Sequence, residues 1–230
     1  MPMFGRMTAH LVDYRNQHSL GARLRARRSG PLMRMIEAAY RSHGHVDILD
    51  VGGTPEYWGI IPRPYLEQHR VTIAVLNLPG LARPRDDGPF RFLEGNGCHL
   101  SEIADRAFHI AHSNSVLEHV GDWRQMTAFA GEIYRVAPRS FVQTPNFWFP
   151  VEPHYMTPCF HWLPKATQVW LVRHFQLGTL ERAATVDRAV RTVESASLVS
   201  RAMFRALFPE SRIVTERVLG LPKSLIAIKD

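Results

Sequence analysis

The stretch Val46-Asp47-Ile48-Leu49-Asp50-Val51-Gly52-Gly53-Thr54 decides the fold class. Its first six residues form a short, largely apolar run, which is typical of a strand buried in a sheet. The two glycines then mark a turn where a ligand can approach the backbone, because no side chain intervenes. In open α/β sheets, ligands bind beyond the carboxyl ends of the strands. The turn is therefore a candidate binding position, although a plain glycine turn explains the same residues.

Short runs with strand character recur downstream, each closed by glycine, proline or polar residues. They cover residues 71–76, 91–94, 107–112 and 140–144, and a helical pattern separates the last two. Strands that alternate with helices indicate βαβ units and a parallel sheet. Two final runs, 212–218 and 223–228, predict an antiparallel hairpin. The expected fold class is α/β, a Rossmann-like and mostly parallel sheet with a C-terminal antiparallel hairpin.

Composition divides the 230 residues into an arm and a domain. Residues 1–44 are expected to form a basic, helical N-terminal arm, with a helix that begins at Pro31 and ends at Gly44. Residues 45–230 are expected to form the α/β domain. Within it, 146–182 read as a helical insertion after the fifth strand, rich in aromatic residues, that should act as a lid.

Charge and cysteine content restrict the function classes. The arm carries eight arginines and two acids, whereas the rest of the chain is nearly neutral. Such an arm can contact nucleic acid, an anionic membrane surface or an acidic substrate, or it can form a solvated helix face. Two cysteines give no disulfide framework, and no apolar run reaches the roughly 20 residues of a membrane span. These features predict a cytoplasmic protein that does not span a membrane; a homodimer is left open.

Polar or small residues follow three more of the predicted strands. Asn77 ends the second strand, where ribose-binding folds place a hydrogen-bonding side chain. Residues 94–98 follow the third strand, and 113–120 follow the fourth. Because these strand ends share one edge of the sheet, their residues should form a single crevice. For Asn77 the plain alternative is an ordinary turn asparagine.

In their order along the chain, these residues resemble the class I S-adenosylmethionine-dependent methyltransferases, and most of all the bacterial methyltransferase type 11 group. The resemblance rests on Ile48–Gly53, on Ser113–Val120 and on the stretch Gln143–His154, and it covers about residues 45–230. It implies S-adenosylmethionine as cofactor and a small-molecule acceptor, such as a sugar or natural product, most simply methylated on oxygen. The residues that it assigns to the cofactor are Gly52, Gly53, Thr54, Asn77, Leu78, Asn96, Gly97, Cys98, Asn114 and Ser115.

Three positions depart from the pattern of that family. Asn77 stands where the ribose-binding acid is usual, and Asn96 replaces a frequent Asp. His109 is read as replacing an Asp late in the fourth strand. Each change removes a formal charge, so a non-catalytic protein that keeps the fold is an alternative. A nucleic-acid methyltransferase, prompted by the arm, is another, although nucleic acid is not the favoured partner. A nicotinamide oxidoreductase fits less well because the third glycine is missing.

Methyl transfer to a hydroxyl needs a base, and histidine suits neutral pH. The candidate catalytic residues are His119 beside the crevice, His154 in the insertion, and Glu118, which could orient either. As alternatives, His119 could bond the backbone and His154 could be held by Glu152. Glu118-His119 also resembles a metal-holding stretch of ubiquinone-pathway O-methyltransferases. The sequence shows no complete ligand set, so no metal is expected.

Overall fold

The computed structural model describes residues 20–80 and 86–230, with side chains from Ser29 onward. Its main sheet has seven strands in the order β3-β2-β1-β4-β5-β9-β8. The strands are β1 (Val46–Val51), β2 (Val71–Asn77), β3 (Phe90–Glu94), β4 (Ile110–Asn114), β5 (Arg139–Pro145), β8 (Arg212–Val218) and β9 (Leu221–Lys229).

The first five of these strands run parallel, and β9 is antiparallel to both β5 and β8. The sheet is therefore mostly parallel and ends in an antiparallel hairpin, as the sequence predicts. Since β1 lies between β2 and β4 in the middle of the sheet, its carboxyl end faces the loops that follow both neighbours. This placement makes the turn after β1 the centre of the candidate site.

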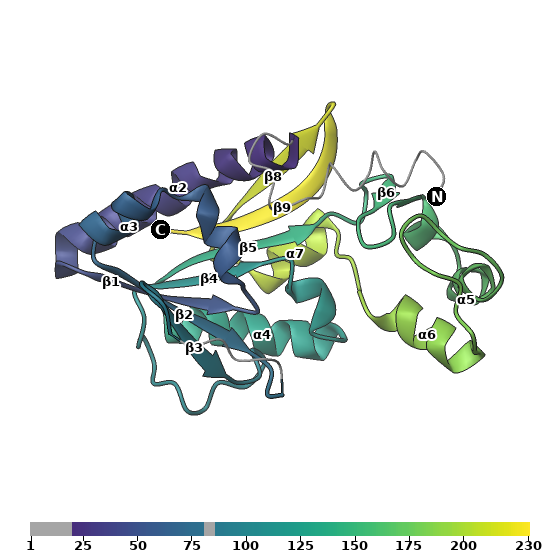
Figure 1. Cartoon of the computed structure of the whole chain (residues 1–230), viewed down its shortest axis with the longest axis horizontal. Helices are drawn as coiled ribbons and strands as arrows, with labels where there is room; N and C mark the ends of the chain where they lie inside the picture. Colours follow the sequence, from purple (N-terminus) through teal and green to yellow (C-terminus); the bar gives the residue numbers. More distant parts are fainter. Residues whose placement is uncertain (1–19, 81–85) are drawn as a thin grey trace.

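Helices cover both faces of the sheet (Figure 1). One face carries α2 (Leu20–His43), η1 (Pro55–Ile60) and α3 (Arg63–Gln68), and the other carries α4 (Trp123–Val136) and α7 (Arg201–Leu207). The result is a three-layer α/β/α arrangement with an apolar core on each side of the sheet. No helix among residues 20–80 and 86–230 is long and apolar enough to cross a membrane.

The helix α4 shows how the sequence sets one of these layers. Asp122 and Gln125 form a capping box: the Asp122 side chain accepts from the Gln125 backbone, and the Gln125 side chain accepts from the Asp122 backbone. Met126, Phe129 and Ile133 then follow at helical spacing and are buried against the sheet. The helix therefore begins at a fixed point beside the strand ends.

The helix α2 differs from the expected arm. It is continuous from Leu20 to His43 and contains Pro31 in its interior, so the predicted helix start at Pro31 is wrong. Leu32, Ile36 and Ala39 of this helix are fully buried and pack against β1 and β2. Most of the basic arm (residues 1–19 and the side chains up to Arg28) lies outside the described residues.

The fourth strand also differs, because it covers 110–114 rather than the predicted 107–112. His109 consequently precedes the strand, and its Nδ1 accepts a hydrogen bond of 2.9 Å from the Asp47 backbone at the start of β1. The interpretation of His109 as a residue late in this strand is therefore wrong. It lies at the amino edge of the sheet, opposite the candidate site.

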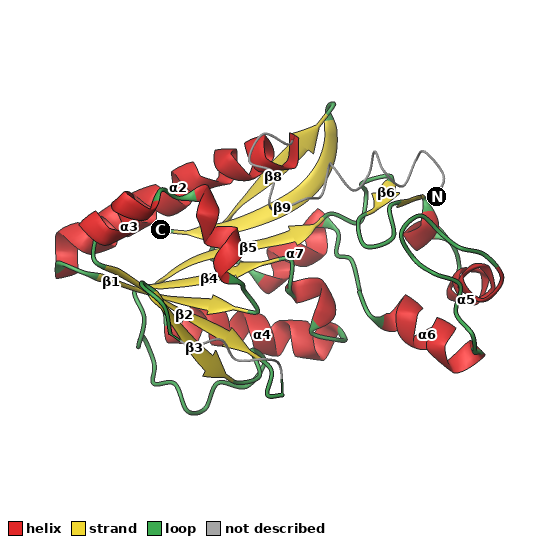
Figure 2. Ribbon diagram, in the orientation of Figure 1, coloured by secondary structure: helices red, strands yellow, loops and turns green. Residues whose placement is uncertain are grey.

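The chain leaves the sheet after β5 and returns at α7. This segment contains the short strands β6 (Val151–Glu152) and β7 (Thr157–Pro158), the turn η3 (Phe160–Trp162), and the helices α5 (Lys165–His174) and α6 (Val186–Glu194). Figure 2 shows it as a separate, mainly helical lobe beside the sheet. A small apolar cluster of its own holds the lobe together, with Phe160, Val172 and Ala189 buried at its centre.

Candidate functional site

The turn after β1 is bonded to the end of β2. The Gly52 backbone N–H donates to the Leu76 carbonyl over 2.7 Å. The Asn77 side-chain amide donates to the Gly53 carbonyl over 3.1 Å. Because the amide nitrogen of Asn77 is engaged in this way, its side-chain oxygen is the atom that could accept a bond from a ribose hydroxyl.

Two glycines allow the neighbouring loops to approach this turn closely. Gly52 has a φ of +71°, and a Cβ on it would lie 2.6 Å from Val116 in the loop after β4. A Cβ on Gly97, after β3, would lie 2.7 Å from Val51 at the end of β1. Four loops thus meet at one edge of the sheet, and the structure brings Gly52, Asn77, Gly97 and Asn114 together there.

A buried polar network below the turn is absent from the sequence prediction. The Asp50 carboxylate accepts from Trp58 Nε1 over 2.7 Å and from His112 Nδ1 over 2.6 Å, and all three side chains are buried. A Cβ on Gly53 would lie 1.8 Å from Asp50 Oδ2, so the turn rests directly on this carboxylate. The ring N–H groups of Trp58 and His112 hold the Asp50 carboxylate in place, and this carboxylate supports the backbone of the turn from beneath.

The other predicted cofactor residues lie on the same edge with different degrees of exposure. Thr54 is exposed and Leu78 is 57% exposed, so both can meet a ligand. The Asn96 side-chain oxygen accepts from the Cys98 backbone N–H over 2.9 Å and so closes its own turn. The Cys98 thiol donates to the Gln125 carbonyl, and burial raises the pKa of this thiol. The Cys98 side chain is therefore an uncharged thiol.

The loop after β4 is held by β5. Ser115 has a φ of +56°, its N–H donates to the Gln143 carbonyl, and its hydroxyl donates to Gln143 Oε1, both over 3.0 Å. Asn114 is in register with Gln143 in the sheet. The left-handed backbone at Ser115 is strained for a residue with a side chain, and such strain is often found at ligand-binding loops.

An ion pair on α4 fastens the loop that follows Gly97. Arg135 pairs with Glu132 over 2.7 Å and donates to the carbonyls of Leu100 and Ile103. Glu132 in turn accepts from the Leu100 N–H over 3.0 Å. The Arg135 hydrogen bond is the main cause that lowers the pKa of Glu132, and burial opposes it. This pair therefore positions the loop that carries Asn96, Gly97 and Cys98.

The three candidate catalytic residues also meet, although they come from different segments. One carboxylate oxygen of Glu118 and one ring nitrogen each of His119 and His154 lie within 4.8 Å of one another. The two Nε2 atoms are 3.1 Å apart. Glu152 Oε1 accepts from His154 Nδ1 over 2.6 Å, and the Ser195 carbonyl accepts from His119 Nδ1 over 2.7 Å.

The protonation of this cluster follows from burial and charge. Burial lowers the pKa of His154, but the hydrogen bond and charge of Glu152, with the charge of Glu118, outweigh it and raise the pKa. Burial raises the pKa of Glu118, and the hydrogen bond from Thr144 and the nearby histidines oppose this increase.

Both alternatives named from the sequence are also present in the hydrogen bonds. His119 bonds the backbone carbonyl of Ser195, and Glu152 holds His154.

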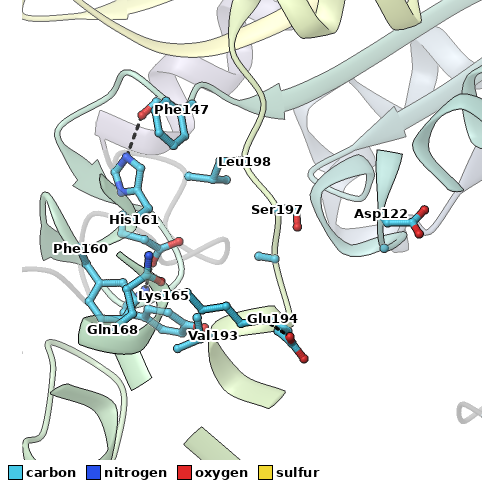
Figure 3. Close-up of a pocket in the computed structure, with 14 residues that line it drawn as sticks. Asp122, Phe147, Phe160, His161, Lys165, Gln168, Val193, Glu194, Ser197 and Leu198 are labelled. Carbon is cyan, nitrogen blue, oxygen red and sulfur yellow. Dashed lines mark hydrogen bonds and ion pairs between the residues drawn. The ribbon is translucent and has the colours of Figure 1, made fainter. Parts of the chain in front are cut away.

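A cavity of about 560 Å³ lies between the lobe and the start of α4 (Figure 3). Glu152 and Tyr155 line it, so it adjoins the histidine cluster. Aromatic side chains and an ion pair between Lys165 and Glu194 form other parts of the wall. None of the ten predicted cofactor residues lines this cavity, so it is distinct from the predicted cofactor positions.

Comparison with known proteins gives matches only at the level of the fold. No family model matches the chain, and no curated protein matches it. Several solved structures are similar. They include PigF in complex with SAH, with 15% identity, a TM-score of 0.44 and coverage of 90% of this chain and 63% of that one. A SAM-dependent methyltransferase from Methanosarcina mazei has 16% identity, a TM-score of 0.44 and coverage of 80% and 92%.

Another similar structure belongs to a protein that is named for a different activity. It is a Rhodobacter sphaeroides protein described as a candidate Zn-dependent alcohol dehydrogenase, with 10% identity, a TM-score of 0.49 and coverage of 85% of this chain and 87% of that one. This chain spans 63% of the PigF chain. These similarities concern the fold.

Proposed function

We propose that this chain is an S-adenosylmethionine-dependent methyltransferase that acts on a small-molecule acceptor, with oxygen as the methylated atom. The convergence of the loops after β1, β2, β3 and β4 on the Gly52-Gly53 turn is the observation that carries the proposal. A Cβ on Gly52 would displace Val116, and a Cβ on Gly53 would displace Asp50, so the chain can make this tight turn only with glycine. In this proposal an extended ligand lies along the strand ends beside the turn.

Each part of the cofactor has a residue of suitable chemistry in this crevice. Asn77 offers a side-chain oxygen for the ribose hydroxyls, and the exposed Leu78 offers an apolar surface for the adenine. Asn96, Gly97 and Cys98 border the purine edge. Gly52, Gly53 and Thr54 lie along the methionine part, with Asn114 and Ser115 near the sulfonium.

S-adenosylmethionine, when bound, supplies an electrophilic methyl group that needs no further activation. The protein's part is to align the acceptor with that methyl group, to exclude water and to take up the acceptor's proton. The cavity beside Glu152 provides the acceptor site in this proposal, and its aromatic walls suit a flat or partly apolar molecule. Glu118, His119 and His154 adjoin this cavity through Glu152 and handle the proton in this proposal.

Calorimetric titration of the full chain with S-adenosylmethionine and S-adenosylhomocysteine tests the cofactor assignment. Saturable binding of both at one site is the expected result. A screen of hydroxylated small molecules for S-adenosylhomocysteine release then tests turnover. Cofactor binding without turnover on any acceptor would favour the non-catalytic alternative, and turnover only on RNA or DNA would favour the nucleic-acid alternative.

A further inference from the structure

The hydrogen atoms on His119 and His154 can be placed from their partners. The Ser195 carbonyl can only accept, so His119 Nδ1 carries a hydrogen. The Glu152 carboxylate accepts from His154 Nδ1, which therefore carries a hydrogen as well. In the neutral form of each ring the lone pair is then on Nε2. These two Nε2 atoms face each other at 3.1 Å, where two lone pairs repel unless a proton or a metal ion lies between them.

Glu118 adds a negative charge at the same point. Its side chain is 1% exposed, and one carboxylate oxygen accepts from Thr144 Oγ1 over 2.9 Å. The other oxygen, Oε1, has no hydrogen-bond partner among the described residues. A buried oxygen of this kind is costly unless a cation or donor satisfies it. A carboxylate oxygen and the two histidine nitrogens lie within 4.8 Å of one another.

We propose that Glu118, His119 and His154 bind a divalent transition-metal ion of the Zn²⁺ type. Two imidazole nitrogens and one carboxylate oxygen form a donor set that suits such ions better than Mg²⁺. With metal–nitrogen bonds of about 2.0–2.1 Å and tetrahedral angles, two ligand nitrogens lie roughly 3.3 Å apart, close to the observed separation. Three protein ligands leave a coordination position open.

The second layer of contacts supports the same assignment. Metal-bound histidines commonly donate their other N–H to a carboxylate or a carbonyl, which fixes the ring and its tautomer. His154 does so to Glu152, and His119 does so to Ser195 at the end of α6. The lobe therefore supplies one ligand and both supporting acceptors. The sequence lacked a complete ligand set because His154 lies 35 positions beyond His119.

The role of the ion rests on the proposed function. At the open position it would hold the acceptor hydroxyl and ease the loss of its proton. Binding of the ion itself does not depend on that role, so the two are tested separately.

Zinc titration of the untagged full chain, stripped with a chelator, tests the site. Wild type should bind Zn²⁺ tightly, and His154→Ala should bind it at least about a hundredfold more weakly, because even changes to supporting residues cost 10–100-fold. Glu152→Gln, which keeps the ligands and removes one support, should cost roughly 10–100-fold. Circular dichroism should show that both variants keep the wild-type fold.

His109→Ala is the matched control, since His45, Asp47 and His109 form another group that could hold an ion. It should leave the tight Zn²⁺ site intact. Co²⁺ should give visible ligand-field absorption in wild type and His109→Ala and none in His154→Ala. Equal Zn²⁺ affinity in wild type and His154→Ala, or a Mg²⁺ affinity at least as high as that for Zn²⁺, would overturn the proposal.

S-adenosylmethionine titration of the stripped protein separates this inference from the proposed function. Zinc binding without cofactor binding would count against the methyltransferase and leave the metal site standing. Cofactor binding without zinc binding would count against the metal site and leave the proposed methyltransferase function standing.

Discussion

Asn77, at the end of β2, donates its side-chain amide to the carbonyl of Gly53 over 3.1 Å. This bond ties the second strand to the glycine turn after the first. If Asn77 also accepts from the ribose, Asn77→Ala should weaken S-adenosylmethionine binding about tenfold, the effect of losing ~1.4 kcal/mol. Calorimetry measures the change. Thr127→Ala, on the exposed side of α4, is the control and should bind as wild type. An Asn77→Ala protein with wild-type affinity would remove Asn77 from the site.

Gly97 is expected to tolerate no side chain. A Cβ there would lie 2.7 Å from Val51 and 3.0 Å from Phe129, so Gly97→Ala should lower the free energy of unfolding by roughly 1–3 kcal/mol. Gly131→Ala is the matched control, because this α4 glycine has open space around it and should gain roughly 0.5–1 kcal/mol. Denaturant unfolding compares the two. Equal stability of both variants would show that the loop after β3 is not packed against β1.

The ion pair of Glu132 and Arg135 should make stability depend on pH. The pKa of Glu132 is lower in the folded state, so its contribution is complete above the unfolded value of about 4.3 and is lost as the pH falls through the folded pKa. Glu132→Gln should therefore lower the melting temperature by roughly 2–4 °C at pH 7, for a loss of about 1 kcal/mol. The difference should shrink below pH 4. A difference that is constant from pH 7 to pH 3.5 would contradict this role.

Trp58 is expected to stabilise the fold through the hydrogen bond that its indole N–H donates to Asp50. Trp58→Phe removes the N–H that Asp50 accepts and leaves this buried carboxylate with one strong donor fewer. The expected loss is about 2–3 kcal/mol of unfolding free energy. Trp170→Phe, at a side chain that is 52% exposed, should change it by less than about 0.5 kcal/mol. Chemical denaturation of both variants checks the contrast, and similar losses would assign the effect to aromatic packing alone.

His154 should be needed for turnover and not for cofactor binding. With an acceptor found by screening, His154→Ala should lower kcat by about a hundredfold or more, whether His154 takes the proton itself or binds an ion that eases loss of the hydroxyl proton to solvent. Its affinity for S-adenosylmethionine should stay within about twofold of wild type. His174→Ala is the control, because the His174 ring contacts only Trp170 through a hydrogen bond and ring stacking among the described contacts. Unchanged kcat would exclude His154 from the chemistry.

The strands were predictable because each buried run ends at residues that break a strand. The runs before Gly52 and Asn77 are apolar and bounded, and both strands end where the sequence places them. The run at 107–112 has no residue that marks where the strand begins, so its start was placed three residues too early and its end two residues too early. The helix through Pro31 was missed because a buried face at Leu32 and Ile36 outweighs the local effect of proline.

The site was predictable only where its residues are close in sequence or follow strand ends. Glu118 and His119 are adjacent, and the edge rule for parallel sheets brings Gly52 and Asn77 together. The bond of Asp50 to His112 joins residues 62 positions apart, and no local pattern indicates it. The distance between His119 and His154 depends likewise on how the lobe folds back, which tertiary packing decides.

Isothermal titration of the full chain with S-adenosylmethionine tests the central claim most directly. One molecule should bind per chain, S-adenosylhomocysteine should compete for the same site, and Asn77→Ala should weaken both. No heat at millimolar ligand, or wild-type affinity in Asn77→Ala together with Gly52→Val, would contradict the assignment of the crevice.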